Sequence, residues 1–71
     1  MSIAITAPMA GKIGEVFVKV GEQVEESQTV LVFEAMKMEN DIVAPEDGTV
    51  EKILVTTGQT VKAGDELVLL A

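Results

Sequence analysis

The chain has 71 residues, and twelve acidic against five basic side chains give it a net charge of −7. A chain this short forms one small domain, and its negative charge argues against binding to nucleic acid or to an anionic membrane. It contains neither cysteine nor histidine, which excludes disulfides and argues against metal sites and the usual general base.

The first half of the chain reads as short strands separated by turns. Ile3 and Ile5 alternate with the smaller Ala4 and Thr6, which is typical of a half-buried strand, and a second strand is expected over residues 12–20. Gly21-Glu22 is a turn signal, and Val24, isolated among polar residues, reads as a loop residue that plugs the core. Residues 29–34 are apolar on both faces up to the glutamate, so we expect a strand buried on both sides.

The second half continues in the same way. Short strands are expected over residues 42–43, 49–55 and 66–70, with a turn at Asp47-Gly48 and an isolated Val61 between them. No window shows a convincing helical period. These patterns predict an all-β barrel or sandwich.

The second half also repeats the first. Ala7-Pro8 recurs as Ala44-Pro45, and other positions recur in the same register without gaps. The recurring positions pair as Gly11 with Gly48, Val18 with Val55, Gly21 with Gly58, and Val24 with Val61. The same turns therefore recur, and we expect the glycines where φ is positive or where two backbones approach closely.

Neither copy is long enough to bury an apolar face alone. We therefore expect one domain over 1–71 in which the halves, about 3–35 and 40–71, interlock around an approximate two-fold axis. The link between them becomes a protruding hairpin with its tip at 36–38. The opposite end holds both termini. This arrangement suits a domain that is tethered at one end and is acted on by partner enzymes at the other.

The hairpin tip carries an unusual combination of residues, a lysine between two methionines. Lys37 lies between Met36 and Met38, with Glu34 and Glu39 close by. A lysine amine in water is protonated at neutral pH and is a poor nucleophile, so Lys37 needs an outside enzyme to be acylated. A solvated surface lysine is the commonest alternative. Methionines at a tip suit docking to several partners because they repack easily, and we expect at most one of the two to enter the core.

The run Ala35-Met36-Lys37-Met38 resembles the attachment motif of biotin carrier (biotinyl) domains. The resemblance extends over essentially the whole chain, including Ala7-Pro8-Met9 and the closing Gly64-Asp65 strand. Lipoyl domains share the fold and a hairpin lysine, but typically have Asp before that lysine and Ala after it. The methionines at these positions favour biotin.

The resemblance implies a fold, a cofactor and a set of site residues. The fold would be a flattened barrel or sandwich of two four-stranded antiparallel sheets, the barrel-sandwich hybrid. The cofactor would be biotin, joined by a biotin protein ligase to the lysine amine through an amide. The implied site comprises Lys37, Ala35, Met36 and Met38 for cofactor binding, and Glu34 and Glu39 for ligase recognition.

The resemblance also implies a carrier that catalyses nothing itself. Its partners would be the ligase, a biotin carboxylase and a carboxyltransferase or decarboxylase subunit, served by a swinging arm. We expect a monomeric, cytoplasmic domain. The chain departs from the family at Ala10, where many relatives have a second proline, and at Ser27, where they have glycine. The protruding thumb of some acetyl-CoA carboxylase carriers is also absent.

Three alternatives differ in kind from a biotin carrier. A lipoyl carrier of a 2-oxo acid dehydrogenase complex has the same fold, but the methionines beside the lysine speak against it. An unmodified interaction module, like the barrel-sandwich parts of membrane-fusion proteins, has no need of a central Met-Lys-Met. An enzyme is the weakest reading, because the sequence shows no nucleophile–base pair, metal cluster or phosphate loop.

Overall fold

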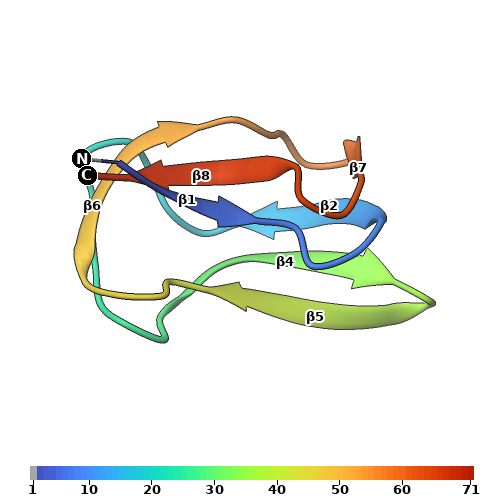
Figure 1. Cartoon of the computed structure of the whole chain (residues 1–71). Helices are drawn as coiled ribbons and strands as arrows, with labels where there is room; N and C mark the ends of the chain where they lie inside the picture. The colour runs from blue at the N-terminus through green and yellow to red at the C-terminus, as the bar shows by residue number, and fades with distance from the viewer. Residues whose placement is uncertain (1) are drawn as a thin grey trace.

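Two antiparallel sheets of four strands each lie face to face in the computed structural model of the protein (Figure 1). The structure describes residues 2–71, so Met1 of the predicted domain lies outside the described residues. The strands are β1 (Ile3–Thr6), β2 (Gly11–Val16), β3 (Gln23–Val24), β4 (Thr29–Ala35), β5 (Met38–Val43), β6 (Gly48–Ile53), β7 (Thr60–Val61) and β8 (Glu66–Leu70). Residues 2–71 form no helix that could cross a membrane. The predicted all-β sandwich is confirmed.

The two halves of the chain are interlocked. One sheet has the strand order β1-β8-β6-β3 and the other the order β5-β4-β2-β7, so each sheet takes strands from both halves. β1 pairs with β8, and β2 pairs with β7 as well as with β4. Because β1 and β8, and likewise β2 and β7, come from opposite halves, neither half can complete its hydrogen bonding alone.

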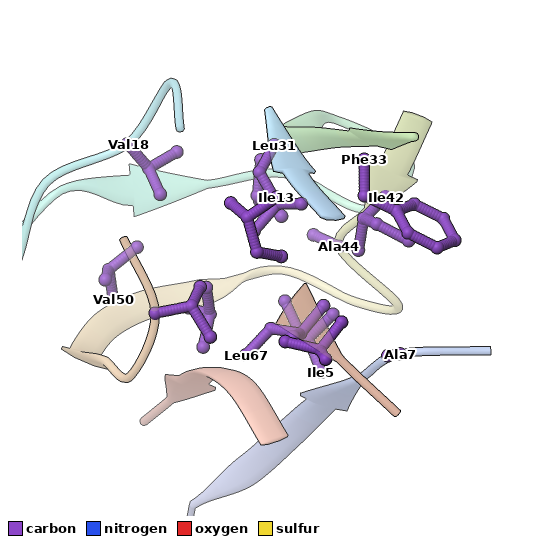
Figure 2. Packing of buried hydrophobic residues seen from close by; sticks show 14 of the residues in the cluster. Ile5, Ala7, Ile13, Val18, Leu31, Phe33, Ile42, Ala44, Val50 and Leu67 are labelled. Atoms are coloured by element: carbon purple, nitrogen blue, oxygen red, sulfur yellow. The ribbon is translucent and has the colours of Figure 1, made fainter. Parts of the chain in front are cut away.

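The core lies between the sheets, and its side chains point toward one another. Figure 2 shows Ile13 and Leu31 from one sheet facing Val50 and Leu67 from the other, and all four are buried. None of the buried side chains in residues 2–71 is polar or charged. The fold is therefore held together by burial of apolar side chains, which is the dominant favourable contribution to folding.

Two expected strands differ from the observed ones. β2 ends at Val16 rather than extending over 12–20, after a register shift against β4 between Ile13 and Val16. Val18 still reaches the core, but Val20 is exposed. The strand expected over 49–55 likewise ends at Ile53, as β6. Strand ends of this kind depend on the neighbouring strand and not on the local apolar pattern.

Two further details correct the sequence-based picture. The strand expected at 42–43 is the end of the longer β5, whose first residues are polar and belong to the hairpin. In β4, burial on both faces is confined to Val30 and Leu31, next to a register shift at the start of the strand. Beyond them the strand alternates, with Val32 half-buried and Phe33 buried. The isolated valines, Val24 and Val61, fill the core as expected, but from the two-residue strands β3 and β7 and not from loops.

The repeated glycines have the two expected causes. Gly21 and Gly58 have φ of 91° and 93°, a conformation that costs an L-residue with a side chain roughly 1–2 kcal/mol. At Gly11 the cause is contact, because a Cβ there would lie 2.6 Å from the carbonyl oxygen of Glu34. Glycine therefore recurs where both halves require a positive φ or a close contact between backbones.

Ser27 has φ of 71° where the equivalent position in the second half is Gly64, with φ of 88°. Both amides make the same 2.8 Å bond, to the carbonyl oxygen of Ala44 and of Ala7 respectively. We expect Ser27→Gly to raise the free energy of unfolding by about 0.5–1 kcal/mol, since relief of the left-handed strain exceeds the entropy gained by the unfolded chain. Equilibrium urea unfolding measures the difference.

The reverse substitution, Gly64→Ser, is the matched control and should lower stability by a similar amount. A Ser27→Gly variant no more stable than the parent chain would show that the serine turn carries no strain.

Candidate functional site

The hairpin between β4 and β5 turns in two residues, Met36 and Lys37. Their φ angles are 53° and 65°, and positive φ at both central residues is the signature of a type I′ turn, which matches the twist of paired strands. Ala35 pairs with Met38 to close the hairpin. The turn is thus one residue shorter than the expected tip, because Met38 is already the first residue of β5.

The residue types in this turn are unfavourable for its backbone conformation. Type I′ turns favour Asn and Gly, which adopt positive φ at little cost. Met36 and Lys37 each carry a strain of roughly 1–2 kcal/mol in that conformation. Strain of this kind persists where the surroundings impose it and is concentrated at functional sites. Here the long β4–β5 pairing imposes it.

The hairpin places Lys37 at one end of an elongated molecule, whose principal extents are 31 × 17 × 17 Å. Figure 1 shows the β4–β5 tip protruding beyond the other strands, while the two ends of the chain lie together at the far end. At that far end Ile3 pairs with Leu70. The Lys37 side chain is exposed, so its amine is open to an enzyme that approaches along the long axis.

Met36 and Met38 are both exposed, to 85% and 66%. At most one was expected in the core, and neither enters it. Ala35, the cross-strand neighbour of Met38, is buried, so burial along β4 continues up to the residue before the turn. Ala35 thus lies buried at the base of the turn, and Lys37 has an exposed apolar residue on either side of it in the sequence.

Because both methionines are in solvent, their replacement should hardly affect stability. We expect Met36→Leu and Met38→Leu to change the free energy of unfolding by less than about 0.5 kcal/mol, as exposed substitutions usually do. Urea unfolding of both variants checks this. A loss of several kcal/mol would instead identify a buried side chain, as removal of core packing does.

Glu34 and Glu39 face each other across β4 and β5, and both are exposed. Like charges directly opposite in a sheet are unfavourable, so this pair does not serve the fold. Lys12 pairs with Glu34 from the other side, on β2. The structure therefore brings an acidic pair to the flank of the hairpin that carries Lys37, where a basic partner can meet it.

A shallow groove of about 330 Å³ lies against the same acidic pair. Lys12, Gly14 and Val32 line it, together with Thr57 from the segment before β7. No sequence pattern indicates this groove, because its walls come from segments that only the interlocked topology brings together. Residues 2–71 hold no cluster of acidic side chains that could bind a metal ion.

Comparison with known proteins decides the family. The family described as "Biotin-requiring enzyme" matches residues 3–70, nearly the whole chain. The chain belongs to this family. Within the family, attachment of biotin is covalent, so a biotin cofactor fits an exposed amine on a tight turn.

Two relatives illustrate the similarity. The chain is 55% identical over 65 residues to "Biotin carboxyl carrier protein" of Streptococcus mutans, covering 92% of this chain but 50% of that protein. It is 47% identical over 66 residues to "Biotin carboxyl carrier protein of acetyl-CoA carboxylase" of Solanum lycopersicum, covering 93% and 94%. The chain therefore spans only half of the first relative.

Solved structures of family members share the fold. A single-chain long-chain acyl-CoA carboxylase contains a domain with a TM-score of 0.90 and 35% identity, which covers 96% of this chain and 7% of that one. The lipoyl domain of the 2-oxoglutarate dehydrogenase complex of Azotobacter vinelandii scores 0.83 at 28% identity, covering 97% and 95%. The lipoyl domain is thus alike in fold, but the biotin carriers are closer in sequence, and the lipoyl alternative is less supported.

Proposed function

We propose that this domain is a biotin carboxyl carrier in which Lys37 holds the cofactor. The observation that carries the proposal is the hairpin itself, which presents one lysine on a strained two-residue turn at the end of the molecule remote from both termini. The names of the relatives and the residues beside the lysine support biotin over lipoate.

The chain's part in loading is to present an amine. A biotin protein ligase supplies the activated acid and accepts a proton from the Lys37 ammonium, and the amine then attacks the acyl carbon to form an amide as the activating group leaves. Lys37 cannot do this alone, since the activated acid comes from the ligase. When attached, biotin supplies a group that accepts a carboxyl at one active centre and yields it at another.

Each neighbour of the lysine has a distinct part. Ala35, buried at the base of the turn, fixes the direction in which the hairpin projects. Met36 and Met38 give apolar contact to whichever enzyme docks, and thioether side chains adapt to differing surfaces. Glu34 and Glu39 provide a negative surface that steers a basic patch of the ligase toward the tip.

The partners proposed are the ligase, a biotin carboxylase, and a carboxyltransferase or decarboxylase. The domain over 1–71 acts as one non-catalytic, monomeric unit in the cytoplasm, and its charge of −7 keeps it in solution. A tether at the end where both termini lie leaves the lysine free to reach each active site, and tethering raises its effective concentration there.

Intact mass spectrometry tests the proposal. The domain is incubated with biotin, ATP and a biotin protein ligase, and in parallel with lipoate, ATP and a lipoate ligase. We expect a mass gain of one biotin less one water in the first arm and none in the second. A gain with lipoate alone would identify a lipoyl carrier, and no gain in either arm of a folded domain would favour an unmodified interaction module.

A further inference from the structure

Two of the four methionines of this protein, Met36 and Met38, lie at its attachment hairpin. The chain has no cysteine, histidine, tryptophan or tyrosine, so methionine is its most readily oxidised residue. Met36 and Met38 are the two most exposed large apolar side chains in residues 2–71, and Met9 is 42% exposed. The buried core of the same residues contains no methionine.

The fold leaves both hairpin thioethers unprotected. Met36 has a positive φ within the two-residue turn, and Met38 starts β5 directly after it. The tip of this hairpin protrudes beyond the other strands (Figure 1). Neither side chain can withdraw into the core without undoing the pairing of Ala35 with Met38. Both sulfur atoms are therefore open to a small oxidant in the folded state.

Oxidation at these positions does not disturb the packing that holds the fold. A sulfoxide in a core disrupts it, because a flexible apolar side chain becomes polar. Here the core is formed without sulfur, so the domain remains folded while the surface around Lys37 changes from apolar to polar. A chemical change confined to the docking surface, with no loss of stability, is what a reversible switch requires.

We propose that Met36 and Met38 are a modification site, at which oxidation to methionine sulfoxide by a peroxide reversibly slows biotin attachment to Lys37. The inference rests on the proposed function. The thioether sulfur attacks one peroxide oxygen, the O–O bond breaks, and the other oxygen leaves as water after proton transfer. Sulfur is oxidised by two electrons and the peroxide is reduced by the same two.

The effect on loading follows from desolvation. A ligase that contacts Lys37 must cover the adjacent methionines, and a sulfoxide covered without a hydrogen-bond partner costs free energy that a thioether does not. Methionine sulfoxide reductases reverse the change with two electrons from a dithiol, releasing the oxygen as water, and a separate enzyme acts on each sulfoxide epimer. The apolar surface is then restored.

The test measures loading of the oxidised domain. The apo domain is treated with hydrogen peroxide, the peroxide is removed with catalase, and peptide mass mapping locates the added oxygen atoms. The initial rate of biotinylation by an untreated ligase is then followed by intact mass. We expect Met36 and Met38 to be oxidised before Met9, and the rate to fall about ten-fold, the effect of one buried unpaired polar group. Treatment with both reductases and a dithiol should restore it.

Two variants separate the hairpin from the rest of the chain. A Met9→Leu domain should keep the full sensitivity to peroxide. A Met36→Leu, Met38→Leu double variant should load at the same rate before and after treatment, whatever its own rate. Circular dichroism and the urea midpoint of the oxidised parent should match those of the untreated domain.

The inference is overturned if loading is unchanged with both hairpin sulfurs oxidised, or if the double variant loses as much rate as the parent. Unfolding of the oxidised domain would also overturn it, because the loss would then be structural. If the untreated domain accepts no biotin, the proposed function fails and the inference falls with it, an outcome distinct from loading that peroxide does not affect.

Discussion

A Lys37→Arg domain should fold as the parent does and accept no biotin. The guanidinium group of arginine is not deprotonated in proteins, so it offers no free amine for acylation. The fold should survive because residue 37 is exposed at a turn, and arginine meets the same positive φ that lysine does. Intact mass after incubation with ligase, biotin and ATP measures the loading, and urea unfolding measures the stability.

The control for this prediction is another exposed lysine. All five basic residues of the chain are lysines, and each is exposed. Lys52 lies on β6, away from the hairpin, so Lys52→Arg should load fully. Loading of Lys37→Arg would place the attachment on a different lysine, and its failure to fold would contradict an exposed position at the turn.

Solvent exposure therefore does not distinguish Lys37 from the other lysines. What sets it apart is geometry: a tight turn at the extreme end of the molecule, a positive φ, and an apolar residue on either side. An enzyme that reads this shape and the adjacent apolar surface can select one amine from five of equal charge. The strain of the turn is then a cost that the fold bears for recognition.

Much of the fold was predictable because local sequence patterns indicate its turns and its buried positions. The paired turns at Gly21 and Gly58, the plugging valines and the repeat all follow from short-range preferences, and the structure confirms them. The two-sheet arrangement came from the family resemblance. The end of β2 at Val16 was not predictable, since it depends on a register shift against β4 that alternation alone does not encode.

The sequence indicated which residues to propose for the site, but not their geometry. The run around Lys37 pointed to the hairpin, whereas neither Met36 nor Lys37 is a residue type that signals positive φ. The exposure of both methionines depends on how far the hairpin protrudes beyond the other strands, which no local pattern reports. The groove between Lys12 and Thr57 depends wholly on topology.

The two phenylalanines of the chain allow the core to be tested at the base of the hairpin. Phe33 lies on β4, is 1% exposed, and packs so closely on Gly11 that a Cβ there would lie 2.7 Å from its ring. Phe33→Ala should lower the free energy of unfolding by about 3–5 kcal/mol. For a domain this small that is a large share of its total stability, which is on the order of 5 kcal/mol.

Phe17→Ala is the matched control, because the Phe17 side chain, which follows the end of β2, is 49% exposed. Its removal should cost less than about 1.5 kcal/mol, since half of the side chain is in solvent already. Equilibrium urea unfolding of both variants gives the two values, and equal losses would contradict the observed burial.

Because Phe33 is two residues from Ala35 on the strand that leads into the turn, its loss should also slow biotin loading, whereas loss of Phe17 should not. Strand β4 runs from the core to the turn, so the precision with which Lys37 is presented depends on the packing of Phe33.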